Sequence, residues 1–126
     1  MQIARALVPA ALLLATPAAA TAQTRPDPDP WFGRDKALHF GASAVITGGG
    51  YGITSAFSDS LALRIAFGAG AGLLAGVGKE LLDMAGLGTP SWKDFTWDVL
   101  GVAVGVGFAV TLDYAARGPA IVGATR

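Results

Sequence analysis

Three long apolar stretches rich in glycine constrain the fold of this chain more than any other feature. They cover residues 37–57, 61–82 and 95–116, and each is close to the roughly 20 residues that a helix needs to cross a bilayer. The first is the most polar, because hydroxyl side chains and a Gly-Gly-Gly run interrupt it. We therefore expect an all-α membrane protein of about three glycine-rich transmembrane helices, while a partly soluble helical bundle stays open as an alternative.

Glycine spacing supports close packing of these helices. Gly68, Gly72 and Gly76 recur every four residues in the second stretch, and Gly101 and Gly105 do so in the third. Such small-xxx-small patterns let membrane helices approach closely, whereas in water the glycines would weaken the helices. The exposed small-residue surface also allows a second copy or partner helices to bind.

The amino-terminal segment has the pattern of an export signal. Arg5 precedes an apolar run at residues 6–15, and an Ala-Thr-Ala sequence ending at Ala22 predicts cleavage before Gln23. An uncleaved anchor helix is the alternative. The next segment alternates proline with aspartate, which excludes helix and strand. The predicted divisions are a signal peptide (1–22), a Pro/Asp-rich linker (23–35), a three-helix membrane domain (36–117) and a tail (118–126).

Export and three crossings together predict where the chain resides. The mature amino terminus would lie outside the cytoplasm of a bacterium, which places the loop at 83–93 on the periplasmic side of the inner membrane. Arg64 and the tail arginines would then lie near the cytoplasm, in agreement with the positive-inside rule. The lipid bilayer is the first expected partner.

Composition excludes several classes of function. Nine Lys and Arg residues balance nine Asp and Glu residues, so the chain lacks the basic surplus of a nucleic-acid-binding protein. Cysteine is absent, which excludes disulfides, thiolate metal sites and the lipid-bearing cysteine of a lipoprotein.

Ionisable residues gather at one end of the predicted bundle. They begin the first helix, end the second and begin the third, and a helical hairpin brings these three places together. The residues are Asp35, Lys36 and His39; Lys79, Glu80 and Asp83; and Ser91, Lys93, Asp94 and Asp98. This clustering does not depend on which side of the membrane the end faces.

The spacing on the third helix is more specific than the clustering. Ser91, Asp94 and Asp98 continue in steps of three and four to Gly101 and Gly105, so they form one stripe along the helix. Two carboxylates therefore lie directly before the glycines that make the helix contact, and we expect both to point into the bundle. An ionisable residue inside an apolar helix is a functional candidate by default.

Carboxylates that share a small space with one imidazole need protons, lysines or a cation to compensate their charge. Oxygen ligands with one histidine suit Mg, Mn or Ca, or Zn if the histidine joins two carboxylates. The candidate metal ligands are His39, Glu80, Asp83, Asp94 and Asp98; the candidate binding residues are Lys79, Glu80, Asp83, Ser91, Asp94 and Asp98; the candidate catalytic residues are His39, Glu80 and Asp98. Structural roles remain open, with Ser91 as a helix cap and Lys79 with Asp83 as an ion pair.

These motifs resemble those of a known family. Asp35-Lys36-x-x-His39, Lys79-Glu80-x-x-Asp83 and Ser91-x-x-Asp94-x-x-x-Asp98-x-x-Gly101 are similar to the YfiM-like family of periplasmic lipoproteins and, more distantly, to VanZ-like membrane proteins. Asp83 and Asp98 stand where VanZ-like proteins carry amides, which makes this site more acidic. The YfiM-like family has no characterised activity, and the VanZ-like family is associated with glycopeptide-antibiotic resistance.

Three functions are compatible with the sequence. The first is an envelope membrane protein whose periplasmic polar site binds a cation or a polar envelope headgroup. The second is a metal-assisted hydrolase or transferase that acts on a lipid-linked or cell-wall substrate, with His39 as acid or base. The third is a non-catalytic membrane scaffold.

Overall fold

The computed structural model describes residues 26–118, which fold into three long helices without strands in that range. The helices are α1 (Arg34–Ser55), α2 (Leu61–Leu82) and α3 (Trp92–Arg117), and a short wide turn of helix, η1 (Asp83–Leu87), extends α2. The predicted signal segment lies outside the described residues. The all-helical fold of three helices is therefore confirmed.

Local signals in the sequence explain where α2 and α3 begin. The side chain of Ser60 accepts a hydrogen bond from the Leu63 amide, and that of Ser91 accepts one from the Asp94 amide at 3.2 Å. Both serines thus satisfy amides that a helix start leaves without partners. At the end of η1, Gly86 has φ of 95°, a conformation that glycine adopts without a steric cost.

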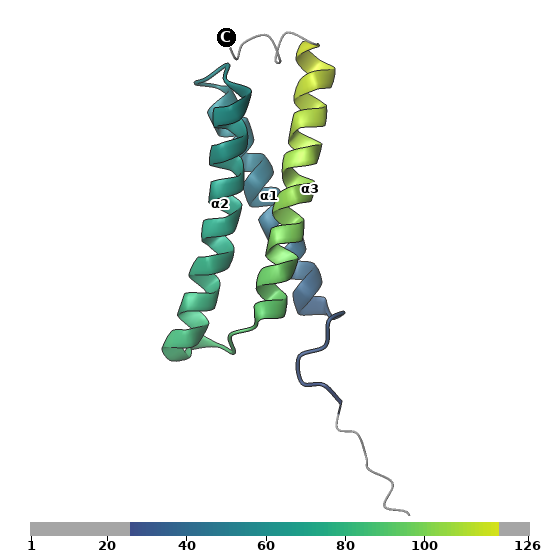
Figure 1. Cartoon of the computed structure of the whole chain (residues 1–126), viewed down its shortest axis with the longest axis vertical. Helices are drawn as coiled ribbons and strands as arrows, with labels where there is room; N and C mark the ends of the chain where they lie inside the picture. Colours follow the sequence, from purple (N-terminus) through teal and green to yellow (C-terminus); the bar gives the residue numbers. More distant parts are fainter. Residues whose placement is uncertain (1–25, 119–126) are drawn as a thin grey trace, which may run out of the picture.

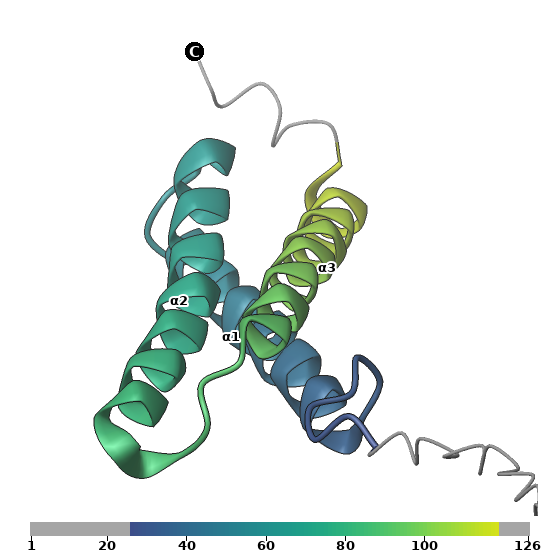
Figure 2. The same ribbon diagram turned by 60° about the horizontal axis from the view of Figure 1, so that its bottom comes forward.

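Helix α1 crosses behind both other helices and packs against each of them (Figures 1 and 2). The start of α1, the end of α2 and the start of α3 lie at one end of the bundle, at the bottom of Figure 1, as the hairpin arrangement predicts. We call this the polar end. The opposite end carries the end of α1, the start of α2 and the end of α3.

Glycines make the helix contacts, and the backbones approach so closely that a methyl group would not fit. A Cβ atom at Gly101 would lie 2.3 Å from the Phe40 carbonyl oxygen, and one at Gly105 would lie 2.6 Å from that of Ala44. On α2, a Cβ atom at Gly68 would lie 2.7 Å from the Thr47 oxygen. The glycine row of α3 therefore faces α1, and the row of α2 faces α1 at Gly68 and α3 at Gly76.

The interior is polar and the surface is apolar, which reverses the usual pattern of a water-soluble protein. Among residues 26–118, the buried hydrophobic side chains are Tyr51 and Val102, whereas most of the large apolar side chains are exposed. The buried polar residues are Lys36, Ser43, Thr47, Arg64, Ser91, Asp94 and Asp98. Helices α2, with its extension to Leu87, and α3 are each long and apolar enough to cross a membrane. Helix α1 does not meet that criterion, in line with its polar sequence.

Candidate functional site

Helix α3 supplies the two most buried carboxylates at the polar end. Asp94 is 5% exposed and Asp98 is 2% exposed, and both lie on the helix face that continues to Gly101 and Gly105. Asp98 also contacts α2, because a Cβ atom at Gly76 would lie 2.7 Å from its Oδ2. The spacing of three and four thus correctly predicted that both carboxylates point into the bundle.

Asp98 holds the imidazole of His39. The His39 Nδ1 atom lies 3.1 Å from both carboxylate oxygens of Asp98, and the Ser43 hydroxyl donates to Asp98 Oδ1 at 2.7 Å. Because a carboxylate only accepts hydrogen bonds, this arrangement assigns the hydrogen to Nδ1. In the neutral imidazole, Nε2 then carries a lone pair.

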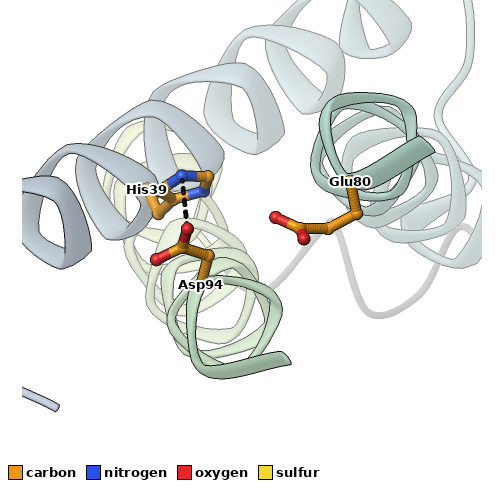
Figure 3. A group of neighbouring side chains, drawn as sticks. All are labelled: His39, Glu80 and Asp94. Atoms are coloured by element: carbon orange, nitrogen blue, oxygen red, sulfur yellow. Dashed lines mark ion pairs between the residues drawn. The ribbon is translucent and has the colours of Figure 1, made fainter. Parts of the chain in front are cut away.

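The Nε2 atom faces a second carboxylate. It lies 3.5 Å from Asp94 Oδ2, the ion pair drawn in Figure 3. With the hydrogen on Nδ1, the Nε2 lone pair points toward a carboxylate oxygen, so the space between these two atoms suits a cation.

Glu80 approaches the same space from α2 (Figure 3). Its Oε2 accepts a hydrogen bond from the Ser91 amide at 2.7 Å, and its Oε1 lies 3.2 Å from Lys79 Nζ. One ligand atom each from His39, Glu80 and Asp94 can be chosen so that all three lie within 4.8 Å of one another. Two carboxylates and one imidazole supplied by three helices form a plausible ligand set for one divalent ion.

Two lysines neutralise Asp94 in this structure. Lys36 Nζ lies 2.6 Å from Asp94 Oδ1, and Lys79 Nζ lies 3.1 Å from Asp94 Oδ2. The Lys36 side chain is 2% exposed, whereas the Lys79 side chain is 38% exposed. Lys36 is therefore a buried part of the site, whereas Lys79 lies at its exposed edge, where it also pairs with Glu80 and Asp83.

A second group of acids surrounds Lys36. Asp29, Asp35 and Asp94 offer oxygens within 4.8 Å of one another, and all three pair with the Lys36 ammonium. The lysine thus already fills the position that a cation would take in that group. Lys79 bridges Glu80 and Asp94 in the same way, but its side chain is partly exposed whereas that of Lys36 is buried. The group of His39, Glu80 and Asp94 is therefore the better candidate for a cation that displaces a lysine, with Asp98 as the residue that orients the histidine.

The remaining predicted site residues lie close by in other roles. Asp83 Oδ2 lies 2.7 Å from Nζ of Lys79, one helical turn earlier in the chain. This is the ion pair that the sequence left open as a structural role. Ser91 caps α3 through its side chain and also donates its hydroxyl to Asp29 Oδ2 at 2.7 Å. Asp83 thus pairs with a lysine, and Ser91 links α3 to the amino-terminal segment.

Sequence reasoning missed two partners in the site. Ser43 lies four residues after His39, on the same face of α1, so helical spacing could have found it. Asp29 comes from the proline-rich segment, and no periodic pattern in the sequence connects it to the helices. Only the folded chain shows that it reaches the site.

The opposite end contains a closed network of charges around Arg64, which is fully buried. Its guanidinium contacts Asp113 Oδ2 at 2.6 Å and Asp59 Oδ1 at 3.0 Å, and its Nε donates to the Ser58 carbonyl at 2.7 Å. Tyr51 also donates to Asp113, at 2.7 Å. Because Arg64 has these partners, we interpret the network as a structural tie among the three helices.

No family model, no curated protein and no solved structure matches this chain, so the functional proposal rests on the geometry of the site.

Proposed function

We propose that this chain is an integral membrane protein whose polar end binds a divalent cation through His39, Glu80 and Asp94. The observation that carries the proposal is the geometry of His39. Asp98 holds Nδ1, so Nε2 is directed at Asp94, and Glu80 faces the same space. In metal sites, a histidine ligand usually donates its other ring N–H to a carboxylate or another acceptor in this way.

The reversed burial pattern supports three crossings rather than two. On α1 the buried row consists of Lys36, Ser43, Thr47 and Tyr51, while Val45 and Ile53 are 75% and 68% exposed. An apolar outer face around a polar inner face suits a helix that contacts lipid on one side and its neighbours on the other. We infer that α1 crosses the bilayer with α2 and α3.

Aromatic side chains support a position of the polar end at a membrane surface. Trp31, Phe32, Trp92 and Trp97 surround it, and tryptophan is enriched at the boundary between headgroups and hydrocarbon. The ring of Trp31 packs edge to face on that of Trp92, with centroids 4.7 Å apart. We assign the polar end to the interface and not to the centre of the bilayer.

The signal pattern in residues 1–22 carries the proposed orientation, with the polar end on the periplasmic side of the bacterial inner membrane. Arg64, near the start of α2, and Arg117, at the end of α3, lie at the other end, which agrees with the positive-inside rule. Lys36, Lys79 and Lys93 at the polar end count against this orientation, because the rule counts lysine and arginine whether or not they pair with carboxylates.

A metal-assisted hydrolase or transferase acting on a lipid-linked or cell-wall substrate is the second candidate. It is favoured by the Asp98–His39 pair, because a carboxylate-held imidazole is suited to move a proton at Nε2. In this case the carboxylates of Glu80 and Asp94, and not His39, would hold a divalent ion, and that ion would supply an activated water. Substitution of His39 by Asn should then abolish hydrolysis of a phosphodiester substrate by metal-loaded protein; unchanged turnover would exclude this role.

Metal titration of purified protein in detergent tests the leading proposal. We expect wild type to bind one equivalent of Zn²⁺ or Mn²⁺, and Glu80→Gln to weaken that binding at least tenfold. Asp83→Asn is the matched control, because Asp83 belongs to the same end but pairs only with Lys79 among its salt bridges. Failure of wild type to bind either ion, or equal losses in the two variants, would refute the assignment. Circular dichroism should verify that both variants fold.

A further inference from the structure

The proline-rich segment before α1 folds back over the polar end. We call residues 27–32 the strap. Lys93 pairs with Asp27 at 2.8 Å and donates to the main-chain oxygen of Asp29, while Trp97 Nε1 donates to the Trp31 oxygen at 2.9 Å. A segment that composition alone describes as a spacer is therefore fastened to α3.

The carboxylate of Asp29 occupies a small set of donors. It accepts hydrogen bonds from Lys36 Nζ and, at 2.7 Å, from Ser91 Oγ. Both donors are more than nine-tenths buried, with Lys36 at 1% and Ser91 at 7% exposure, whereas the Asp29 side chain is 35% exposed. Asp29 thus covers a buried ammonium and a hydroxyl from the solvent side.

We propose that Asp29 is a tethered stand-in for the oxyanion of a ligand, and that Lys36 and Ser91 form the subsite for a phosphate or carboxylate group. These donors already hold one carboxylate, so exchange of Asp29 for another oxyanion retains a negative group in the subsite. Lys36 also pairs with Asp35 and Asp94, so the subsite accepts another oxyanion in place of Asp29 and not in addition to it. Lys93 lies beside the subsite but pairs with Asp27, so it fastens the strap. The subsite adjoins the proposed cation site through Lys36, which pairs with Asp94.

The strap is fastened weakly enough to be displaced. Its residues Asp27, Pro28 and Pro30 are exposed, and the Asp27 carboxylate that pairs with Lys93 is 54% exposed, so salt screens this pair. The prolines restrict the segment before it docks, which lowers the entropy cost of docking but adds no contact. The Asp29 carboxylate is the main polar link between the strap and the buried donors.

This inference deepens the proposed function by naming the class of ligand that binds next to the cation, and it can be tested without metal. All three tryptophans of the chain lie at this end, and Trp31 belongs to the strap. Strap release separates Trp31 from Trp92, so intrinsic fluorescence reports it. Phosphorus NMR or calorimetry measures the binding of inorganic phosphate to protein in detergent. Tryptophan fluorescence of protein in nanodiscs of phosphatidylglycerol or phosphatidylcholine tests whether a lipid headgroup is the ligand.

The decisive comparison is Asp29→Ala against Asp27→Ala. The first vacates the subsite, and the second removes a strap aspartate that touches neither Lys36 nor Ser91. We expect Asp29→Ala to bind phosphate at least tenfold more tightly than wild type, and Asp27→Ala to stay within about threefold, because competition from the tethered carboxylate is lost only in the first.

The two lipid arms identify the source of the oxyanion. Tighter binding of free phosphate assigns a soluble ligand, and a fluorescence change in phosphatidylglycerol but not phosphatidylcholine nanodiscs assigns a lipid headgroup. Equal affinities in the two alanine variants, with no fluorescence response in either arm, would overturn the inference. If the protein binds no metal but Asp29→Ala raises its affinity for phosphate, the cation site alone is refuted. If the protein binds metal but Asp29→Ala leaves the phosphate affinity unchanged, the oxyanion subsite alone is refuted.

Discussion

Replacing Gly101 by alanine should push α1 away from α3 and disturb the histidine site. The new Cβ atom would lie 2.3 Å from the Phe40 carbonyl oxygen and within 3.1 Å of two further backbone atoms of that residue. Backbone cannot rotate aside as a side chain can, so the helices must separate by about 1 Å to reach van der Waals distance. Overpacking of this kind costs about 1–3 kcal/mol of folding free energy.

The same displacement reaches the site, because His39 directly precedes Phe40 on α1. A separation of about 1 Å would lengthen the 3.1 Å contacts between His39 Nδ1 and Asp98 beyond the roughly 3.2 Å upper end of an N–H···O hydrogen bond. We therefore expect Gly101→Ala to lower both the stability of the protein and its affinity for metal.

Gly107 on the same helix is the matched control. A Cβ atom there meets nothing within 4 Å, so alanine should be neutral or add about 0.5–1 kcal/mol through its better helix propensity. Thermal unfolding in detergent, followed by circular dichroism, compares the two variants, and a metal titration follows the site. If Gly101→Ala unfolds at the same temperature as Gly107→Ala, the close packing inferred for α1 and α3 is wrong.

Three further predictions concern the charged residues. Asp98→Asn should lower metal affinity about 10–100-fold, because an amide holds His39 less strongly; a titration that shows wild-type affinity would contradict this role. Arg64→Met should destabilise the fold by about 3–5 kcal/mol, because it takes the buried arginine away from the buried carboxylate of Asp113. Arg117→Met, at a side chain that is 42% exposed, should cost less than about 1 kcal/mol; unfolding curves that rank the two in reverse would refute the network. Hydrogen bonds from a lysine ammonium and a serine hydroxyl lower the pKa of Asp29, so its contribution to the stability of the folded state is present at neutral pH and is lost as the pH falls below about 4. Tryptophan fluorescence should therefore stay constant from pH 8 to 5. A release of the strap near neutral pH would show that the Asp29 carboxylate does not hold it.

The sequence alone predicted the helices and the end at which the charges gather. Three apolar stretches of membrane length predicted α1, α2 and α3, and the steps from Ser91 to Gly105 placed Asp94 and Asp98 inside the bundle. These features are readable because a helix converts sequence spacing directly into a face, so one local rule relates residues up to several turns apart.

The sequence could not choose among the candidate ligands. Asp83 and Glu80 are three residues apart on the same helical segment and looked equivalent, yet Glu80 joins His39 and Asp94 while Asp83 pairs with Lys79. The difference depends on the crossing of α1 over α2 and α3, a tertiary property that helical periodicity does not contain. The role of Lys79 as a binding residue and that of Asp83 as a binding residue and metal ligand stay predictions.

The tertiary structure also decided the roles of the strap and of the far end. Proline fixes the local backbone of residues 26–30 but does not determine where the segment docks, so the contact between Asp29 and Lys36 has no signal in the sequence. Arg64 and Asp113 are 49 positions apart and meet only because antiparallel helices bring the start of α2 beside the end of α3. Local spacing thus determined which residues share a helix face. Which side chains on two different helices pair with each other was decided by packing, because glycine sets how closely helices approach without specifying which polar groups then meet.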